Sequence, residues 1–145
     1  MNLNDWLDRG WLIQHRPDRQ EIRELLDIAD RDIADSQVKG TSTDTRLSIA
    51  YNAALQLAIA ALTANGYRLG HEAHHYRAIQ SLAFTIGADT DLIDLLDSFR
   101  KKRNISDYER AGTISEQEGR EMLELAKNLR ETVTTWLKKS HPELI

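Results

Sequence analysis

Two short stretches of the sequence carry most of the side chains that could do chemistry. They are RKKRNISDY at residues 100–108 and GHEAHHYR at residues 70–77. The planar guanidinium group of Arg103 can hold a phosphate through two parallel hydrogen bonds. His74 or His75 can accept or donate a proton near neutral pH. Together the two stretches define a candidate site for a phosphate-containing ligand.

The helical spacing of the basic stretch places Arg103 on an apolar face. That face contains Leu92, Leu96, Phe99 and Arg103. Asp107 lies one turn beyond Arg103, and Asn104 and Tyr108 form a second i, i+4 pair beside them. We therefore expect some of these polar groups to face the protein interior or a partner. The structural alternative is an Arg–Asp pair that only ties the helix end together, with the arginine stem covering apolar surface.

The elements that must position these residues are helices. Only two prolines occur, near the ends of the chain, and apolar residues recur with helical spacing between them. Ser115 and Glu118 match a capping box that begins the last helix. Helices are expected at about 5–9, 18–36, 43–65, 71–86, from 90 through the basic run, and from 115 to 139. We predict an all-α fold, an antiparallel four-helix up-and-down bundle with an additional short N-terminal helix, as a single domain over residues 1–145.

A helical hairpin would bring the two stretches together. Folding the chain at residues 88 and 89 places Arg103 level with His74, and Asp107 level with the start of the preceding helix. This predicts a patch of His74 or His75 with Arg103, Asn104 and Asp107. The alternative is a core His75 whose hydrogen bonds are satisfied and a surface His74.

Other chemistries have little support in the sequence. His71 and His75 have helical spacing beside Glu72, but no HExxH pattern or distant acidic ligand set accompanies them. No glycine-rich phosphate loop, nucleophile elbow or dinucleotide fingerprint is present. We therefore predict neither a metal site nor a cofactor.

Composition narrows the function classes further. The 145 residues include no cysteine, which excludes thiol catalysis and cysteine zinc sites. The net charge of −4 does not favour nonspecific nucleic-acid binding, so an RNA contact would depend on the basic run at 100–103. The start of the chain lacks a secretory pattern. The long apolar segment near residues 47–67 is interrupted by polar residues, which favours a buried helix, no membrane partner and a cytoplasmic protein.

Several segments, in order and spacing, resemble a bacterial and archaeal branch of the HEPN superfamily. They are AYNAALQLAIAALTANGYR, GHEAHHYRAIQSL, FRKKRNISDYERAGTISEQE and VTTWLKK, together with the N-terminal DWLDRGWLIQHRPDRQEIRELLDIADRDIADS. The resemblance covers nearly the whole chain. It implies a bundle of four main helices plus a short extra one, usually as a homodimer. It also implies RNases of toxin–antitoxin or phage-defence systems, partners of minimal nucleotidyltransferases, or noncatalytic nucleotide- or RNA-binding modules.

The resemblance also assigns roles within the basic stretch. In the RNase members an arginine and a polar residue are followed, several residues later, by a histidine. Arg103 and Asn104 match the first half of this motif, whereas Asp107 and Tyr108 stand where the histidine is expected. An aspartate is a poor substitute for a group that must titrate near neutral pH unless its pKa is strongly raised.

Three interpretations follow from these observations. The first is a noncatalytic homodimeric module that binds a nucleotide, RNA or a partner such as a nucleotidyltransferase or antitoxin. Its binding residues would be Arg100, Arg103, Asn104, Tyr108, His74 and His75. The second is a metal-independent RNase with Arg103, Asp107 and His75 as candidate catalytic residues. The third is a purely structural patch in a scaffolding dimer.

Overall fold

The computed structural model describes residues 1–108 and 112–145, and for residues 107 and 108 it describes the backbone only. This part of the chain is mostly helical, which confirms the all-α class. The α-helices are α1 Leu3–Asp8, α2 Arg19–Asp35, α3 Thr43–Ala64, α4 His74–Ser81, α5 Thr90–Tyr108 and α6 Glu116–Ser140. Two short strands, β1 Leu12–Gln14 and β2 Tyr67–Leu69, and a 3₁₀ turn at Pro142–Leu144 complete the described elements.

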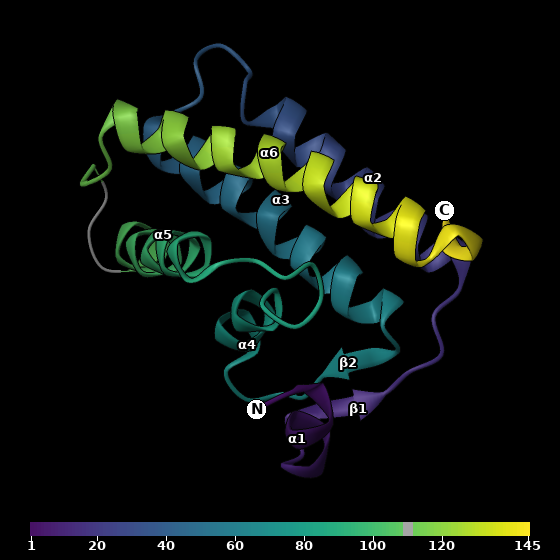
Figure 1. Ribbon diagram of the computed structural model, residues 1–145. Coiled ribbons are helices and arrows are strands. Elements are labelled where there is room, and N and C mark those ends of the chain that lie inside the picture. The colour runs from purple at the N-terminus through teal and green to yellow at the C-terminus, as the bar shows by residue number, and fades with distance from the viewer. Residues whose placement is uncertain (109–111) are drawn as a thin grey trace.

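The centre of the protein is α3, which packs against both α2 and α6 (Figure 1). In this view α2 runs opposite to α3 and α6. Helix α3 is apolar around most of its circumference, as expected of a helix covered on several sides. It is long and apolar enough to cross a membrane, but 72% of its 18-residue apolar window is buried inside the protein. The prediction of a buried helix in this segment is therefore confirmed.

Helices α2 and α6 pack against α3 through the apolar stripes that their sequences predict. The buried stripe residues are Ile22, Leu26, Ala29, Met122, Leu125, Ala126, Leu129, Val133 and Leu137. Asp18 caps α2, and the predicted capping box of Ser115 and Glu118 begins α6. These caps satisfy backbone amides that have no partner within the first helical turn.

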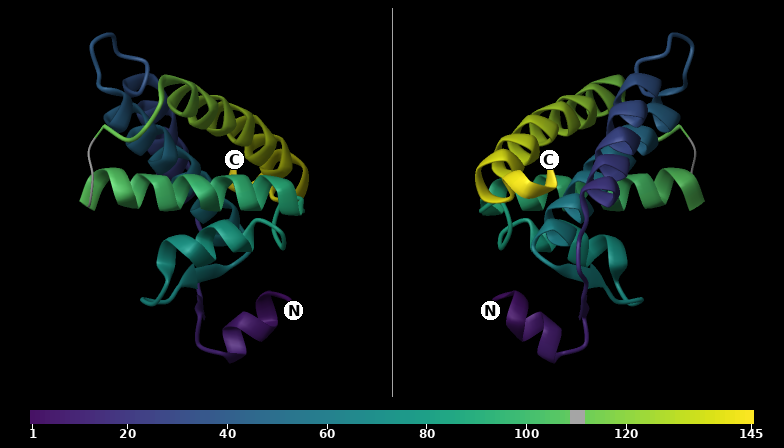
Figure 2. Two further views of the ribbon diagram at one scale, coloured as in Figure 1. Left: turned by 90° about the vertical axis from the view of Figure 1, so that its left-hand side faces the viewer. Right: turned by 90° about the vertical axis from the view of Figure 1, so that its right-hand side faces the viewer.

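Helices α4 and α5 lie across α2, α3 and α6. In Figure 1 α5 is seen nearly along its axis, and the turned views of Figure 2 show it lengthwise. The expected helix at 71–86 is shorter than predicted, because α4 covers only His74–Ser81. The residues before His74 do not continue the helix. The Gly70 amide donates to the Trp11 carbonyl at 2.9 Å, and Ala73 has a positive φ of 50°, which is not a helical value. Residues after α4 form turns up to Gly87.

A small antiparallel sheet is present that the sequence analysis did not predict. Strands β1 and β2 pair in the register Leu12 to Leu69, Ile13 to Arg68 and Gln14 to Tyr67. Each strand has three residues, too few to show the alternating pattern that identifies a strand. A Cβ atom at Gly70 would lie 3.2 Å from the carbonyl oxygens of Gly10 and Trp11, so the crossing after β2 favours glycine there.

An aromatic cluster attaches α1 to the rest of the protein. The Trp6 ring packs edge-on against Trp11 and Phe84, with centroids 5.8 and 5.5 Å apart. Trp6 is only 5% exposed, and the Arg77 guanidinium lies 4.1 Å from the centroid of Trp11. Trp6 and Trp11 therefore anchor the N-terminal helix.

The buried face of α5 differs in one residue from the predicted stripe. Leu96 and Phe99 are fully buried, as expected, and Ile93 joins them. Leu95, the neighbour of Leu96, is outside this buried face and is 44% exposed. The reason is geometric, because Leu95 is rotated by about 100° from Leu96 on the helix.

A buried polar pair links α2 to α3. Asp32 is 5% exposed, and its Oδ2 atom accepts a hydrogen bond of 2.6 Å from the Asn52 side-chain amide. Its Oδ1 atom accepts two hydrogen bonds of 3.1 Å from Arg31. The side-chain oxygen of Asn52 in turn accepts a weaker hydrogen bond of 3.4 Å from the side-chain amide of Gln56. This network lets an ionised carboxylate lie between two packed helices.

Candidate functional site

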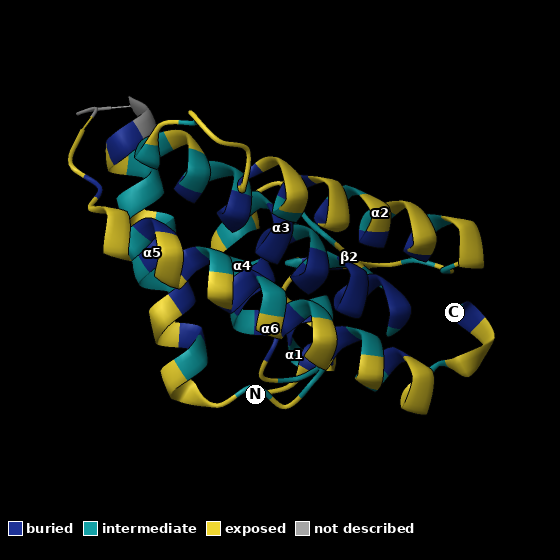
Figure 3. Cartoon of the chain, turned by 90° about the horizontal axis from the view of Figure 1, so that it is seen from above, coloured by how far each residue is buried: buried dark blue, intermediate teal, exposed yellow. Residues whose placement is uncertain are grey.

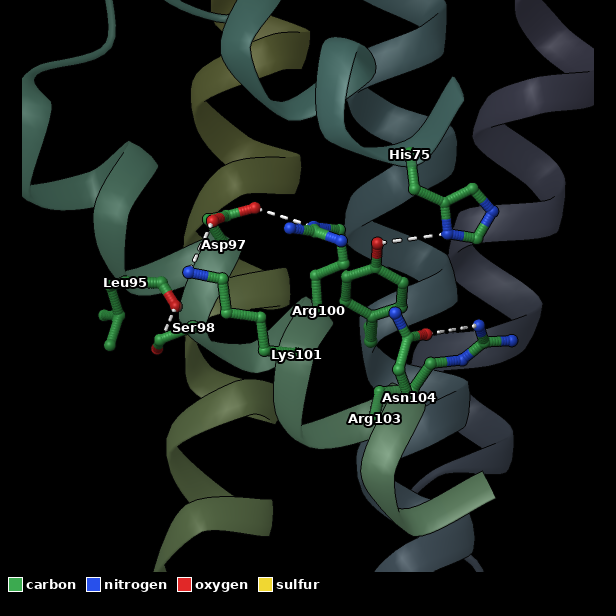
Figure 4. Close-up of polar contacts among 9 residues, drawn as sticks. His75, Leu95, Asp97, Ser98, Arg100, Lys101, Arg103 and Asn104 are labelled. Carbon is green, nitrogen blue, oxygen red and sulfur yellow. Dashed lines mark hydrogen bonds and ion pairs between the residues drawn. The ribbon is translucent and has the colours of Figure 1, made fainter. Parts of the chain in front are cut away.

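The candidate site lies where α3, α4 and α5 meet (Figure 4). Helix α3 contributes Tyr51, the first turn of α4 contributes His75, and α5 contributes Arg100, Arg103 and Asn104. The three α5 residues point to the side of that helix on which His75 lies. As predicted, His75 lies near the basic stretch. The side chains of both lie next to Tyr51.

Tyr51 and His75 share a hydrogen bond at the centre of the site. The Tyr51 hydroxyl oxygen lies 3.2 Å from His75 Nδ1, and the two ring centroids are 5.9 Å apart. Tyr51 is only 1% exposed, and burial raises its pKa to about 12, although the nearby Arg103 and Arg100 partly oppose this rise. The phenol therefore keeps its proton at neutral pH and can donate it to Nδ1.

His75 is held in its neutral form. Burial lowers its pKa below the ordinary value of 6.5, and the positive charges of Arg103, His74 and Arg100 lower it further. A neutral imidazole that accepts the Tyr51 proton at Nδ1 carries its own proton on Nε2. His75 can then offer one N–H donor next to the arginines.

Arg103 also lies near the Tyr51 ring. Its guanidinium carbon is 5.7 Å from the centroid of the Tyr51 ring, and its Nη1 atom is 3.5 Å from Asn104 Oδ1. The second contact is long for a hydrogen bond and is correspondingly weak. Arg103 and His75 thus lie beside one buried phenol, an arrangement that could present two kinds of donor to a single anionic group.

Arg100 is tied to its own helix. Its Nε atom donates to Asp97 Oδ1 at 2.7 Å, and its guanidinium lies 5.5 Å from the centroid of the exposed Tyr76 ring. Lys101 approaches the other oxygen of Asp97 at 3.5 Å. One carboxylate therefore balances part of the charge of two neighbouring cations.

Lys102 is also paired, with Glu118 at the start of α6. The Lys102 ammonium donates to this carboxylate and lowers the pKa of Glu118. Arg100, Lys101 and Lys102 thus all have carboxylate partners within the chain. The basic run is consequently less available for a long nucleic-acid contact than its sequence indicates.

His74 does not join the Arg103 side of the site. It is exposed, and its ring centroid lies 6.1 Å from that of His75. It lines a different groove of about 430 Å³ between α2 and β2, together with Glu21 and Glu24. The structure therefore brings His75, and not His74, into line with Arg103.

Asp107 and Tyr108 were predicted to contribute to the site, but their side chains lie outside the described part of the chain. The α5 backbone extends through Tyr108, but the side chains of both residues belong to the part that is not described. Their proposed contributions to binding or catalysis stay predictions.

The metal interpretation gains no geometric support. His71 precedes α4, so it does not share a helical face with His75. Within residues 1–106 and 112–145, no group of three or more metal-ligating side chains comes together.

Sequence reasoning missed the two residues that organise this site. By its spacing Tyr51 belongs to the apolar face of its helix, and nothing in the spacing alone marks Asp97 as part of a site. Tyr51 is the lone hydroxyl-bearing ring on an otherwise aliphatic face, and Asp97 precedes Arg100 and Lys101 by three and four residues. Both signals are visible in the sequence, but neither shows that Tyr51 lies next to both His75 and Arg103.

The raised pKa of Tyr51 predicts a specific loss of stability in alkali. The unfolded protein releases this proton near pH 10, whereas the folded protein keeps it until about pH 12. The contribution is therefore complete below pH 10 and is lost as the pH rises from 10 to about 12. We expect Tyr51→Phe to show a shallower fall in the free energy of unfolding over this range, measured by urea denaturation. Tyr76→Phe, an exposed control, should follow the wild type.

Comparisons with known proteins do not place the chain in a family. No family model matches the sequence. No curated protein matches it either. The fold and the side-chain geometry are therefore the basis for a functional proposal.

Proposed function

We propose that this protein is a HEPN-like, noncatalytic module that binds the phosphate of a nucleotide or RNA and acts as a homodimer. The observation that carries the proposal is the placement of Arg103 and neutral His75 beside the same buried residue, Tyr51. A guanidinium group and an imidazole N–H suit the oxygens of one phosphate.

The arrangement of helices supports the HEPN-like part of the proposal. Helices α2, α3 and α6 lie side by side, with α2 antiparallel to the other two, while α5 crosses them and the short α1 lies at the N-terminus (Figure 1). The proposed bundle of four main helices is thus α2, α3, α5 and α6. The crossing of α5 and the shared direction of α3 and α6 depart from the antiparallel up-and-down bundle that the sequence predicts.

Two features favour binding over catalysis. A general acid must be protonated at working pH, but burial and nearby cations lower the pKa of His75. The Nδ1 atom of His75 also contacts Tyr51, which restricts the ring. The pairing of Arg100 and Lys101 with Asp97 further favours a small ligand or a single RNA phosphate over an extended duplex contact.

An RNase of the toxin–antitoxin or phage-defence type is the second candidate. It is favoured by the same neutral His75, which could act as a general base beside an arginine-bound phosphate. Expression of wild type, Arg103→Ala and His75→Ala in cells distinguishes the two. Slowed growth and RNA cleavage that both substitutions abolish would establish the RNase, whereas intact RNA in all three cultures supports the binding module.

Binding measurements test the first candidate. Wild-type protein is titrated with a nucleoside monophosphate and a nucleoside triphosphate by calorimetry, and with a short labelled RNA by fluorescence anisotropy. We expect Arg103→Ala to raise the dissociation constant by about 10- to 100-fold, because a charge-assisted hydrogen bond contributes about 1.5–3 kcal/mol. Arg103→Lys should recover only part of the affinity, because lysine lacks the planar fork.

Arg120→Ala is the matched control for this experiment. It removes the same charge from an exposed position on α6, where Arg120 has only a loose contact of 3.7 Å with Glu116. Its affinity should equal that of the wild type. Equal losses of affinity in Arg103→Ala and Arg120→Ala would show that binding depends on net charge and not on this site. A wild type that binds a protein partner but none of the three probes would refute the phosphate proposal.

A further inference from the structure

The groove that His74 lines is a second concave surface, and we call it the α2–β2 groove. Side chains of α2, α3 and β2 line it, together with His74 at the start of α4. Its volume of about 430 Å³ is in the range usual for small-molecule sites. His74 lines this groove, whereas its neighbour His75 contacts Tyr51 instead. The groove is therefore separate from the candidate phosphate site.

The floor of the α2–β2 groove is apolar. Leu25 and Ile28 of α2 contribute to it, and they lie beside the buried stripe of that helix. Ile59 of α3 and Leu69 of β2 complete it. These four side chains are only half-buried. Figure 3 shows the same contrast at the level of helices, with a mostly buried α3 beside an α2 that alternates between buried and exposed residues. An apolar ligand in the groove would remove this surface from water, which favours binding.

The α2 wall of the groove carries two carboxylates. Glu21 and Glu24 are three residues apart, so they lie on neighbouring positions of one helix side. Both oxygens of Glu21 already contact His15 Nε2, at 2.7 and 2.9 Å. Glu24 is exposed and accepts one hydrogen bond of 3.1 Å from Gln20, which leaves its carboxylate with further acceptor capacity. Glu24 is thus the better acceptor for a cationic group of a ligand.

The opposite wall has a different charge. It carries Arg68 of β2 and the imidazole of His74. The Arg68 guanidinium repels a positive group, so the positive end of a ligand is directed toward Glu24 on α2. Two carboxylates against one guanidinium favour a cation over an anion, and the net charge of −4 acts in the same direction.

We propose that the α2–β2 groove binds a small apolar amine. The apolar body lies on Leu25, Ile28 and Ile59, and the ammonium group pairs with Glu24. The apolar contact supplies most of the affinity, whereas an ion pair at an exposed carboxylate adds selectivity between ligands of equal size. This inference goes beyond the proposed function and does not rest on it.

Three probes with the same six-carbon chain test the proposal, namely hexylamine, hexanol and hexanoate. Each is titrated into protein with ¹³C-labelled isoleucine methyl groups and followed by NMR. We expect saturable shifts of the Ile28 and Ile59 methyl signals, while Ile105 on α5 stays unchanged. The dissociation constant should be lowest for hexylamine, by about threefold or more relative to hexanoate, because an exposed ion pair is weak.

Glu24→Gln isolates the contribution of the carboxylate. It removes the charge with little change in size, so hexylamine should lose its advantage over hexanol while hexanol binds as before. Glu131→Gln is the matched control, because it removes an exposed charge from α6 and should keep the advantage. Leu25→Ser should weaken the binding of all three probes. Urea denaturation checks that each variant folds, and the Glu24→Gln comparison stands even if Leu25→Ser does not.

Three results would overturn the proposal. They are the absence of saturable shifts with hexylamine, equal affinity for hexylamine and hexanoate, and an advantage of hexylamine that persists in Glu24→Gln. Nucleotide binding at Arg103 is scored on the His75 resonance and amine binding on Ile28 and Ile59. Each of the two proposals can therefore fail without the other.

Discussion

Phe99→Ala should lower the free energy of unfolding by about 3–5 kcal/mol, as is usual when a large buried aromatic side chain is truncated. Phe99 is 1% exposed and lies one residue before Arg100 on α5. Together with Leu96 it fixes this crossing helix to the core. Because α5 carries Arg103 and Asn104, the loss of this anchor should also weaken any ligand binding at the site. Urea denaturation followed by circular dichroism measures the effect.

Ile105→Ala is the matched control for Phe99→Ala. Ile105 lies on the same helix but is 40% exposed, so its truncation should cost less than about 1 kcal/mol. Similar losses for the two variants would show that the buried face of α5 does not contribute to stability as described. A loss for Phe99→Ala below 1 kcal/mol would have the same meaning.

Asn52→Ala should destabilise the protein by about 2–4 kcal/mol, because it removes a hydrogen bond from a buried carboxylate. Asp32 is buried where α2 packs against α3. The side-chain amide of Asn52, on α3, donates to its carboxylate at 2.6 Å. Arg31 contacts the other carboxylate oxygen but its own side chain is mostly exposed. The midpoint and slope of urea denaturation give the change in free energy.

A double variant tests whether the buried charge is the cause. Replacing both residues, Asp32→Leu with Asn52→Leu, removes the charge together with its donor. The double variant should therefore be more stable than Asn52→Ala alone, since apolar replacement of a buried polar pair is often close to neutral. If the double variant is the less stable of the two, lost packing explains the effect of Asn52→Ala better than an unpaired carboxylate does.

The helical elements were predictable because their signals are local and repeated. The stripe of α6, from Met122 to Leu137, recurs over many turns, and its Ser115–Glu118 capping box marks its start. The alanine-rich face of α3 likewise indicates a helix covered closely by others. These patterns depend on 3.6-residue periodicity and on capping chemistry, which the sequence displays directly.

The departures arise where tertiary contacts override local patterns. The expected helix at 71–86 begins late because Gly70 is bound to the Trp11 backbone, a contact between segments far apart in the chain. The strands at Leu12–Gln14 and Tyr67–Leu69 are too short for periodicity to identify. Leu95 looks like a core residue by type, and only the direction in which α5 crosses the bundle decides that it is exposed.

The candidate site was predictable in part. Helical spacing brought Arg103 onto the inner face of α5, and the hairpin argument placed it near the His74–His75 pair. Choosing His75 required knowledge of the α4 rotation, which the sequence does not contain. The role of Tyr51 depends on three helices meeting at one point, and no spacing within a single helix shows that.

The central claim is that neutral His75 and Arg103 bind one phosphate, and the pKa of His75 tests it most directly. Proton NMR follows the His75 imidazole resonance, assigned with His75→Gln, as a function of pH. In the free protein the pKa should lie below 6.5, and Arg103→Ala should raise it by removing a nearby positive charge.

The decisive comparison repeats this titration with a saturating nucleoside monophosphate. A bound phosphate places negative charge beside the imidazole, so the pKa of His75 should rise. The account predicts this rise in the wild type and its absence in Arg103→Ala. A nucleotide that binds without changing the resonance or the pKa of His75 would contradict it.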